Sequence, residues 1–270
     1  MSLSLVGLLG EWTEELVDLL WPPRCSLCPQ IASVGDCCSD HALPDALEGP
    51  RCPRCAARLP DAIRDGSLCA ECRLRPPAFD LTTACWDYRG QASAREHILA
   101  AKHRGRAELW TQLGVRLGDR LMRSGVQRPL LVPVPSHLSR KIERGYDSVA
   151  LLARAAAERC GGRVVSALRK SRPTRSQGDP LVVDRRRNVR ASFQPAAQLP
   201  LEGRALWLVD DVMTSGATAS ECARALRSLG AREVGVCVLA RATQVAVNES
   251  DRTEEASVRS RLKDVVRESI

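Results

Sequence analysis

Two adjacent aspartates, Asp210 and Asp211, stand where an apolar run meets a turn rich in hydroxyl groups. The stretch from residue 206 to 221 reads LWLVDDVMTSGATASE. Neighbouring carboxylates repel each other, so the pair needs a partner that supplies hydrogen-bond donors. The vicinal hydroxyl groups of a sugar are such donors. The acid pair therefore predicts a ligand whose hydroxyls both carboxylates can accept.

The turn after the acids is predicted to bind a phosphate group. A strand that leads through a turn into a helix collects free amide N–H groups and the positive end of the helix dipole. Glycine permits close approach or a positive φ there. Acids followed by such a turn indicate a ribose 5-phosphate, because the sugar hydroxyls and the phosphate lie a few ångströms apart. The predicted phosphate-binding residues are Met213, Thr214, Ser215, Gly216, Ala217 and Thr218.

A helix cap rich in Ser and Thr behind an ordinary strand is the alternative interpretation of this turn. It explains the hydroxyl groups but leaves the paired acids unexplained. The turn is neither a Walker loop, which requires G-K-[ST], nor a G-x-G-x-x-G dinucleotide loop.

Eight ligand-type residues between positions 25 and 72 have the spacing of zinc knuckles. Three C-x-x-C pairs and one C-x-x-H pair each aim two ligands at one metal ion. Pairing them in chain order gives two closed, structural sites, and zinc would then supply folding energy to a segment with few apolar residues. The first site comprises Cys25, Cys28, Cys38 and His41, and the second comprises Cys52, Cys55, Cys69 and Cys72.

Disulfides or a redox C-x-x-C pair are the alternatives for these cysteines. Cys37 is adjacent to Cys38 and could replace it as a ligand; the spacing favours Cys38. The four other cysteines of the twelve occupy apolar stretches and are expected to be small buried side chains: Cys85, Cys160, Cys222 and Cys237.

The composition predicts a folded chain with an aliphatic core and an anionic partner. Of 270 residues, 44% are apolar but only 3% are aromatic, and the net charge is +8. Phosphates or nucleic acid fit this charge, although a solvated basic surface explains it as well. The scarcity of aromatic residues gives little support to base stacking along single-stranded DNA.

Alternating strand and helix patterns from Phe79 onward predict an α/β fold with a mostly parallel sheet. Residues 1–22 are expected to form an amphipathic helix, too short and too acidic for an export signal or a membrane span. The chain is therefore expected to be cytoplasmic. Residues 23–78 would form a double zinc ribbon, residues 79–243 the α/β domain, and residues 244–270 a charged tail.

The stretch LWLVDDVMTSGATA resembles the phosphoribosyl pyrophosphate signature of type I phosphoribosyltransferases. Together with the cysteine pairs, the segments PPAFD, VPVPSHLSRKIERGYDSVALLARA, RPTRSQ and RRRNVRASF make residues 24–242 resemble the ComF family. This resemblance implies a type I phosphoribosyltransferase-like domain behind a zinc-ribbon module. It also implies a link to competence and the uptake of DNA.

The resemblance further implies roles for individual residues. Asp210 and Asp211 would bind the ribose hydroxyls, and the turn after them the 5-phosphate. Mg²⁺ would accompany phosphoribosyl pyrophosphate. The pyrophosphate-binding residues would be Ser136, Arg140, Arg144 and Lys102, and the polar positions of a lid over residues 171–190 would be Thr174, Gln177, Arg187 and Asn188. The chain departs from the family at Asp147–Ser148, where Asn-Gln is usual, and at His103, where Tyr is usual.

Two functions from different classes remain open at this point. The chain could be a phosphoribosyltransferase that binds phosphoribosyl pyrophosphate or a related sugar phosphate. Alternatively, it could be a non-catalytic protein that binds single-stranded DNA or docks a helicase of the uptake machinery. Catalytic residues and the acceptor substrate cannot be assigned from the sequence.

Overall fold

The computed structural model describes the chain in several segments. The described residues are 25, 27–28, 30, 32, 37–39, 42–44, 47, 49–63, 66–103, 107–136, 145–171, 192–196 and 201–242. The chain divides into two compact units, Met1–Asp45 and Ala46–Ile270. The predicted N-terminal helix and the charged tail lie outside the described residues, and the predicted domain boundaries stay a prediction.

The second unit is organised around a five-stranded parallel sheet with the order β1-β7-β6-β2-β3. Valine and leucine dominate its inner strands, as expected for strands covered on both faces. The strands are β1 (Leu81–Asp87), β2 (Leu130–Pro133), β3 (Arg163–Val164), β6 (Ala205–Met213) and β7 (Glu233–Arg241). A separate antiparallel pair joins β4 (Leu168–Lys170) to β5 (Phe193–Pro195). The predicted α/β class with a mostly parallel sheet is confirmed.

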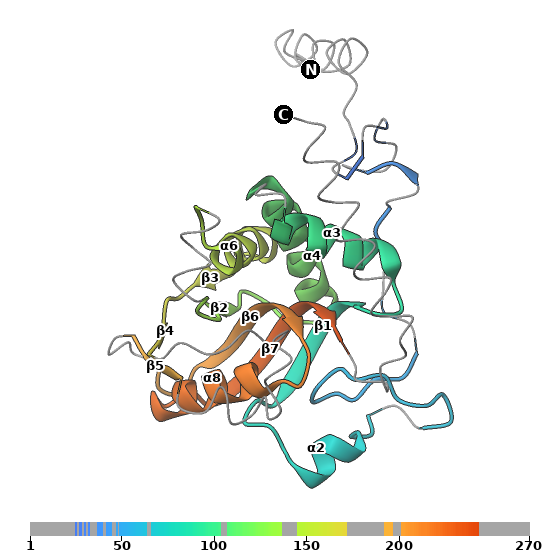
Figure 1. Ribbon diagram of the computed structural model, residues 1–270. Helices are drawn as coiled ribbons and strands as arrows, with labels where there is room; N and C mark the ends of the chain where they lie inside the picture. Colours follow the sequence, from blue (N-terminus) through green and yellow to red (C-terminus); the bar gives the residue numbers. More distant parts are fainter. Residues whose placement is uncertain are drawn as a thin grey trace, which may run out of the picture. The chain divides into compact units, whose positions relative to one another are not determined.

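Helices cover both faces of this sheet, as Figure 1 shows. Helices α3, α4 and α6 lie on one side and α8 lies on the other. Their bounds are α3 (Ala92–His103), α4 (Ala107–Arg123), α6 (Ser148–Cys160) and α8 (Ala217–Ser228), and a short helix α2 spans Ala70–Leu74. The glycines at 161 and 162 predict that the helix over SVALLARAAAERC stops there, and α6 does end at Gly161, whose φ of 65° supplies a left-handed cap.

Helices α4 and α6 approach each other closely because α4 carries glycine at the contact. A Cβ atom at Gly114 would lie 2.6 Å from Cβ of Ala155, and one at Gly118 would lie 2.7 Å from Cβ of Arg159. Neither distance is sterically possible. The two glycines therefore set the separation of this helix pair, which packs against the sheet on the same side as α3.

Strand β6 is longer than the sequence suggests. The apolar run RALWLV predicts a strand that stops before the two aspartates, but β6 continues through Asp210 and Asp211 to Met213. The reason is its neighbour β7, which has nine residues and pairs with β6 as far as Met213↔Arg241. Backbone pairing with β7 thus extends the strand beyond its apolar residues and places both acids inside the sheet.

Candidate functional site

The two aspartates avoid mutual repulsion because they belong to an extended strand, where successive side chains point to opposite faces. Asp210 faces the side that carries α8, and Asp211 faces the side that carries α3. Each carboxylate also accepts a hydrogen bond from the next backbone amide. The N–H of Asp211 donates to Oδ1 of Asp210 at 2.9 Å, and the N–H of Val212 donates to Oδ1 of Asp211 at 2.6 Å. Both acids are therefore held at the carboxyl end of β6.

Lys102, near the end of α3, forms an ion pair with one of the acids. Its Nζ lies 3.0 Å from Oδ2 of Asp211. The sequence predicts that Lys102 contacts pyrophosphate, and that role stays a prediction. What the structure adds is the pairing with Asp211, which no local pattern indicated. The positive charge offsets the crowding of negative charge at the strand end.

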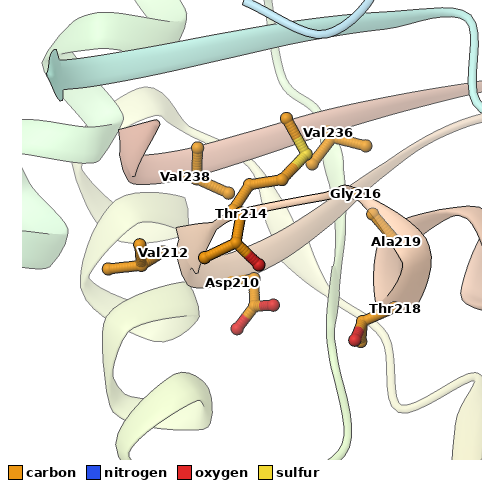
Figure 2. Close-up of a pocket in the computed structure, with 9 residues that line it drawn as sticks. Asp210, Val212, Thr214, Gly216, Thr218, Ala219, Val236 and Val238 are labelled. Carbon is orange, nitrogen blue, oxygen red and sulfur yellow. The ribbon is translucent and has the colours of Figure 1, made fainter. Parts of the chain in front are cut away.

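A hollow opens between the end of β6 and the start of α8. Asp210, Thr214, Gly216 and Thr218 line it together with valines of β6 and β7 (Figure 2). Ligand sites of open α/β sheets lie at this end of the strands. The structure thus brings residues predicted for ribose and for phosphate to one hollow.

The first turn of α8 lies at this hollow. Gly216 is its N-cap residue, with φ at 71°, and as a glycine it makes no side-chain cap hydrogen bond. The first amide groups of a helix have no partner within the helix, and they carry its positive dipole end. Ser215 Oγ accepts from the Ala217 amide at 3.4 Å, which shapes the turn. The start of α8 therefore has the properties of an anion site.

The cysteine cluster of the second unit has the geometry of a closed metal site. The sulfur atoms of Cys52, Cys55, Cys69 and Cys72 lie within 4.8 Å of one another. Sγ of Cys55 lies 3.6 Å from Sγ of Cys69. Sulfurs bound to one tetrahedral zinc lie about 3.8 Å apart, whereas a disulfide requires about 2.05 Å. The four thiols fit a metal ion and not a disulfide.

A tight turn holds two of these thiols. The amide of Cys52 donates to the Ala57 carbonyl at 2.9 Å, and the amide of Ala56 donates to the Cys52 carbonyl at 2.8 Å. Ala56 has a φ of 55°, which bends the chain around the sulfurs. The other two come from α2: Cys69 is its N-cap, and its sulfur accepts from the amide of Cys72 at 3.4 Å. Local backbone geometry thus aims all four sulfurs inward.

The first unit holds a second cluster, formed by Cys25, Cys28 and Cys38. Sγ of Cys28 lies 3.7 Å from Sγ of Cys38, again the edge of a metal tetrahedron and too long for a disulfide. Cys38 rather than the adjacent Cys37 supplies the third sulfur. The predicted fourth ligand, His41, lies outside the described residues.

Thiol acidity differs between the cysteines of each cluster. Burial raises the pKa of Cys28 to about 11, and negative charge on Cys25 adds to the increase. Burial likewise raises the pKa of Cys55 to about 11, against the opposing charge of Arg241. Burial also acts on Cys52, but backbone N–H donors outweigh it and lower its pKa to about 7. A metal ion between the sulfurs would favour the thiolate form of all of them.

Comparison with known proteins gives the family. DNA utilization protein YhgH of Salmonella typhi is 31% identical over 228 residues, which cover 82% of this chain and 97% of that protein. YhgH of Escherichia coli K12 is 29% identical over the same extent. Competence protein F of Haemophilus influenzae is 27% identical over 203 residues, 72% of this chain and 85% of that protein. The chain belongs to the ComF/YhgH family. A scan against models of protein families found no match.

Solved structures similar to this ComF/YhgH chain include two larger proteins. An allosteric regulatory enzyme of purine biosynthesis matches with a TM-score of 0.33 and 26% identity, over 48% of this chain and 25% of that one. A glutamine phosphoribosylpyrophosphate amidotransferase from B. subtilis matches with a TM-score of 0.36 and 21% identity, over 59% and 32%. Scores this low carry no argument, so the fold rests on the strand pairing and the family on the relatives.

Further residues predicted for this ComF/YhgH site are placed only in part. Ser136 Oγ donates to Oδ1 of Asp147 at 3.3 Å, and Asp147 is the N-cap of α6, accepting from the Ala150 amide. The departure from the family at residue 147 thus coincides with a helix cap. Two pyrophosphate residues and the four lid residues lie outside the described part of the chain: Arg140, Arg144, Thr174, Gln177, Arg187 and Asn188.

Two residues that support the loop were not predicted from the sequence. Phe79, in the PPAFD segment, is buried beneath the turn, and its ring lies 3.4 Å from where a Cβ of Gly216 would stand. Arg241, the last residue of β7, is also buried and donates to the backbone of the loop. The sequence did offer one indication of this role: Arg241 directly follows the apolar run EVGVCVLA. A guanidinium buried at the end of such a strand requires several hydrogen-bond acceptors.

Among the described helices, none combines the length and the apolar character that crossing a bilayer requires.

Proposed function

We propose that the chain binds the ribose 5-phosphate group of phosphoribosyl pyrophosphate, with Mg²⁺, or of a related sugar phosphate, in the hollow between β6 and α8. One observation carries this proposal. The N-terminus of α8, with a glycine as its N-cap residue, follows after a short turn on a strand whose last residues include two carboxylates. Anion donors and hydroxyl acceptors then lie next to each other, which is the pattern of groups that a phosphorylated pentose presents.

Different residues would bind the ribose, the 5-phosphate and the pyrophosphate of the ligand. The carboxylates of Asp210 and Asp211 would accept hydrogen bonds from the ribose hydroxyls. Amide groups at the start of α8 and the hydroxyls of Thr214 and Thr218 would donate to the 5-phosphate. Lys102 would add positive charge on the side of Asp211. When bound, Mg²⁺ would neutralise charge on the pyrophosphate group.

Phosphoribosyl transfer is the enzymatic form of this proposal. The reaction depends on charge stabilisation and exclusion of water more than on a dedicated base. Ser136, Arg140 and Arg144 would bind the pyrophosphate, and residues 171–190 would close over it. A screen of bases and amines for pyrophosphate release tests turnover. Binding without release from any acceptor would favour a protein that senses or carries the ligand.

Zinc in both cysteine clusters belongs to the same proposal. The sulfur separations fit zinc, and His41 would complete the first site. Reduced thiols at this spacing are typical of a reducing compartment, so we place the protein in the cytoplasm. Both sites would be structural because all their positions are taken by protein ligands.

Binding of phosphoribosyl pyrophosphate with Mg²⁺ by calorimetry tests the central claim. The double substitution Asp210→Ala with Asp211→Ala should abolish it. A matched double substitution, Asp61→Ala with Glu158→Ala, removes the same charge from exposed positions and should leave affinity unchanged. Undiminished binding by the Asp210/Asp211 variant would refute the pocket. Equal losses in both variants would show that net charge alone was responsible.

A second function is favoured by the relatives, which are named for DNA utilization and competence. In this second function the chain is non-catalytic. Its hydrogen-bond donors bind the phosphates of single-stranded DNA, and its protein partner is a helicase of the uptake machinery. The net charge of +8 agrees with it. The logarithm of affinity for single-stranded DNA should then fall steeply with the logarithm of salt concentration, and a flat slope would argue against phosphate contacts.

A further inference from the structure

Arg241 connects the second cysteine cluster to the first turn of the candidate phosphate site. Its Nε donates to the carbonyl of Cys55 at 2.7 Å. Its Nη1 donates to the carbonyls of Met213, at 3.0 Å, and of Thr214. Cys55 belongs to the metal cluster, and Met213 and Thr214 begin the turn that leads into α8. One buried side chain therefore contacts both sites.

The guanidinium group is well suited to this position. It is planar and offers five N–H donors in a fixed arrangement, so it can bind several carbonyls at once. Nη1 also donates to the Ala242 carbonyl at 2.7 Å. Arg241 is only 7% exposed, and losing these acceptors would leave a buried charge unpaired. The buried guanidinium therefore favours a conformation in which these backbone carbonyls stay within hydrogen-bond distance of it.

These contacts orient the peptide groups of the turn. In a trans peptide the C=O and the following N–H point in opposite directions. When Arg241 binds the carbonyls of Met213 and Thr214, the amide groups of Thr214 and Ser215 are directed away from Arg241. An anion site built from backbone amides depends on this orientation, because the donors must converge before the ligand arrives.

The position of Arg241 itself depends on the tight turn that carries Cys55. This turn, residues 52–57, is called the knuckle, and its backbone hydrogen bonds hold Cys52 and Cys55 in place. The same knuckle reaches β1, because Thr82 Oγ1 donates to the Arg54 carbonyl at 2.7 Å and Arg51 pairs with Asp87 at 3.2 Å. From this turn, Arg241 makes the hydrogen-bonded link to the phosphate turn.

We propose that Arg241 is a positioning residue that couples metal binding at Cys52, Cys55, Cys69 and Cys72 to ligand binding at residues 213–218. The inference rests on the proposed function, because it takes this turn as the phosphate site. A metal bound by the Cys55 sulfur would hold the Cys55 carbonyl in place. That carbonyl holds Arg241, and Arg241 orders the turn of residues 213–218 for its ligand. Coupling of this kind is reciprocal, so the ligand must also strengthen retention of the metal.

The first measurement needs no ligand. Hydrogen exchange of the amides in residues 213–218 is compared between the zinc-loaded wild type and the zinc-loaded variant Arg241→Lys. Lysine keeps the charge but has a single nitrogen, so it cannot reproduce the separate contacts of Nε with Cys55 and of Nη1 with Thr214. Exchange should be about fivefold faster or more in the variant, with the zinc content unchanged. Arg51→Lys, which alters the same knuckle on its β1 side, is the matched control and should leave these amides protected.

The second measurement tests reciprocity. The variant Cys25→Ser removes a ligand of the first cluster, in the other compact unit, so the zinc released to a chelator comes from the second. Ribose 5-phosphate should slow this release about fivefold or more, ribose should not, and adding Arg241→Lys should abolish the effect.

The outcomes separate the two claims. If the wild type binds ribose 5-phosphate but Arg241→Lys changes neither amide exchange nor the effect of the ligand on zinc release, the coupling is wrong and the proposed function stands. If the wild type binds neither phosphoribosyl pyrophosphate with Mg²⁺ nor ribose 5-phosphate, the proposed function is wrong and the coupling falls with it.

Discussion

Nζ of Lys102 lies 3.0 Å from Oδ2 of Asp211, so α3 and β6 meet through opposite charges at the carboxyl edge of the sheet. Both side chains are partly open to water, 23% and 20% exposed. Exposed ion pairs of this kind contribute little to folding stability. Their effect is expected on ligands instead, because a sugar phosphate that approaches Asp211 also approaches a cation that is already in place.

Replacing Lys102 by methionine should therefore weaken binding more than folding. We expect affinity for phosphoribosyl pyrophosphate with Mg²⁺ to fall about tenfold, the value of one hydrogen bond to a charged group. The free energy of unfolding should change by less than about 1 kcal/mol. Calorimetry and urea denaturation measure the two. Lys102→Arg, which keeps the charge, should retain most of the affinity, and equal affinity in wild type and Lys102→Met would exclude a ligand contact.

Gly216→Ala should damage the phosphate turn in particular. The positive φ of 71° disfavours alanine by about 1–2 kcal/mol, and the added methyl group would press on Phe79. Gly125→Ala is a matched control, with a φ of 76° and nothing within 4 Å of the new methyl group. Both variants should lose comparable stability, but only Gly216→Ala should bind ribose 5-phosphate more weakly. Equal binding by the two would contradict the assignment of this turn.

The sequence predicted those structural features that depend on residues close together in the chain. The C-x-x-C spacings identified both cysteine clusters, because two ligands on one tight turn must point at the same place. The glycine stop of α6 and the turn before α8 followed from short motifs in the same way. Each of these features depends on a few consecutive residues, so one sequence was sufficient to find it.

The contacts made by Lys102 and Arg241 depend instead on the sheet order. Lys102 reaches Asp211 because α3 follows β1, two strands away from β6. Arg241 reaches Thr214 because Met213 pairs with Arg241 in the register of β6 and β7. No pattern in the chain gives that register. For the same reason the sequence predicted a shorter β6, since pairing with β7 and not apolar character determines its end.

Metal content tests the cysteine clusters one at a time. The wild type should hold two zinc ions per chain, as predicted from the eight ligands, and Cys69→Ser should hold one. Because Cys52, Cys55 and Cys72 are packed in the core of the second unit, we also expect unfolding to become easier by more than about 2 kcal/mol. Cys160→Ser, which changes a thiol outside both clusters, should keep two. Two zinc ions in Cys69→Ser, or fewer than two in Cys160→Ser, would show that the ligands are wrongly assigned.

Thiol labelling distinguishes the buried cysteines from the cluster cysteines. Burial raises the pKa of Cys222 and Cys237 well above the usual value, and for Cys222 the charge of Asp210 adds to the increase. The thiolate is the reactive form, so a raised pKa leaves very little of it at pH 8. In the native protein neither residue should react with iodoacetamide at pH 8, whereas both should react after denaturation.

Metal removal should produce the opposite behaviour in the clusters. The pKa of Cys25 is lowered to about 6, because backbone amides including that of Cys38 outweigh the effect of burial. Without metal, Cys25 should be mostly thiolate at pH 8 and should be labelled first after a chelator is added. Bound metal should protect it, because the sulfur is then a ligand. Peptide mapping by mass spectrometry gives the order of labelling. Modification of Cys237 before Cys25 would contradict both the burial of the sheet thiols and the cluster assignment.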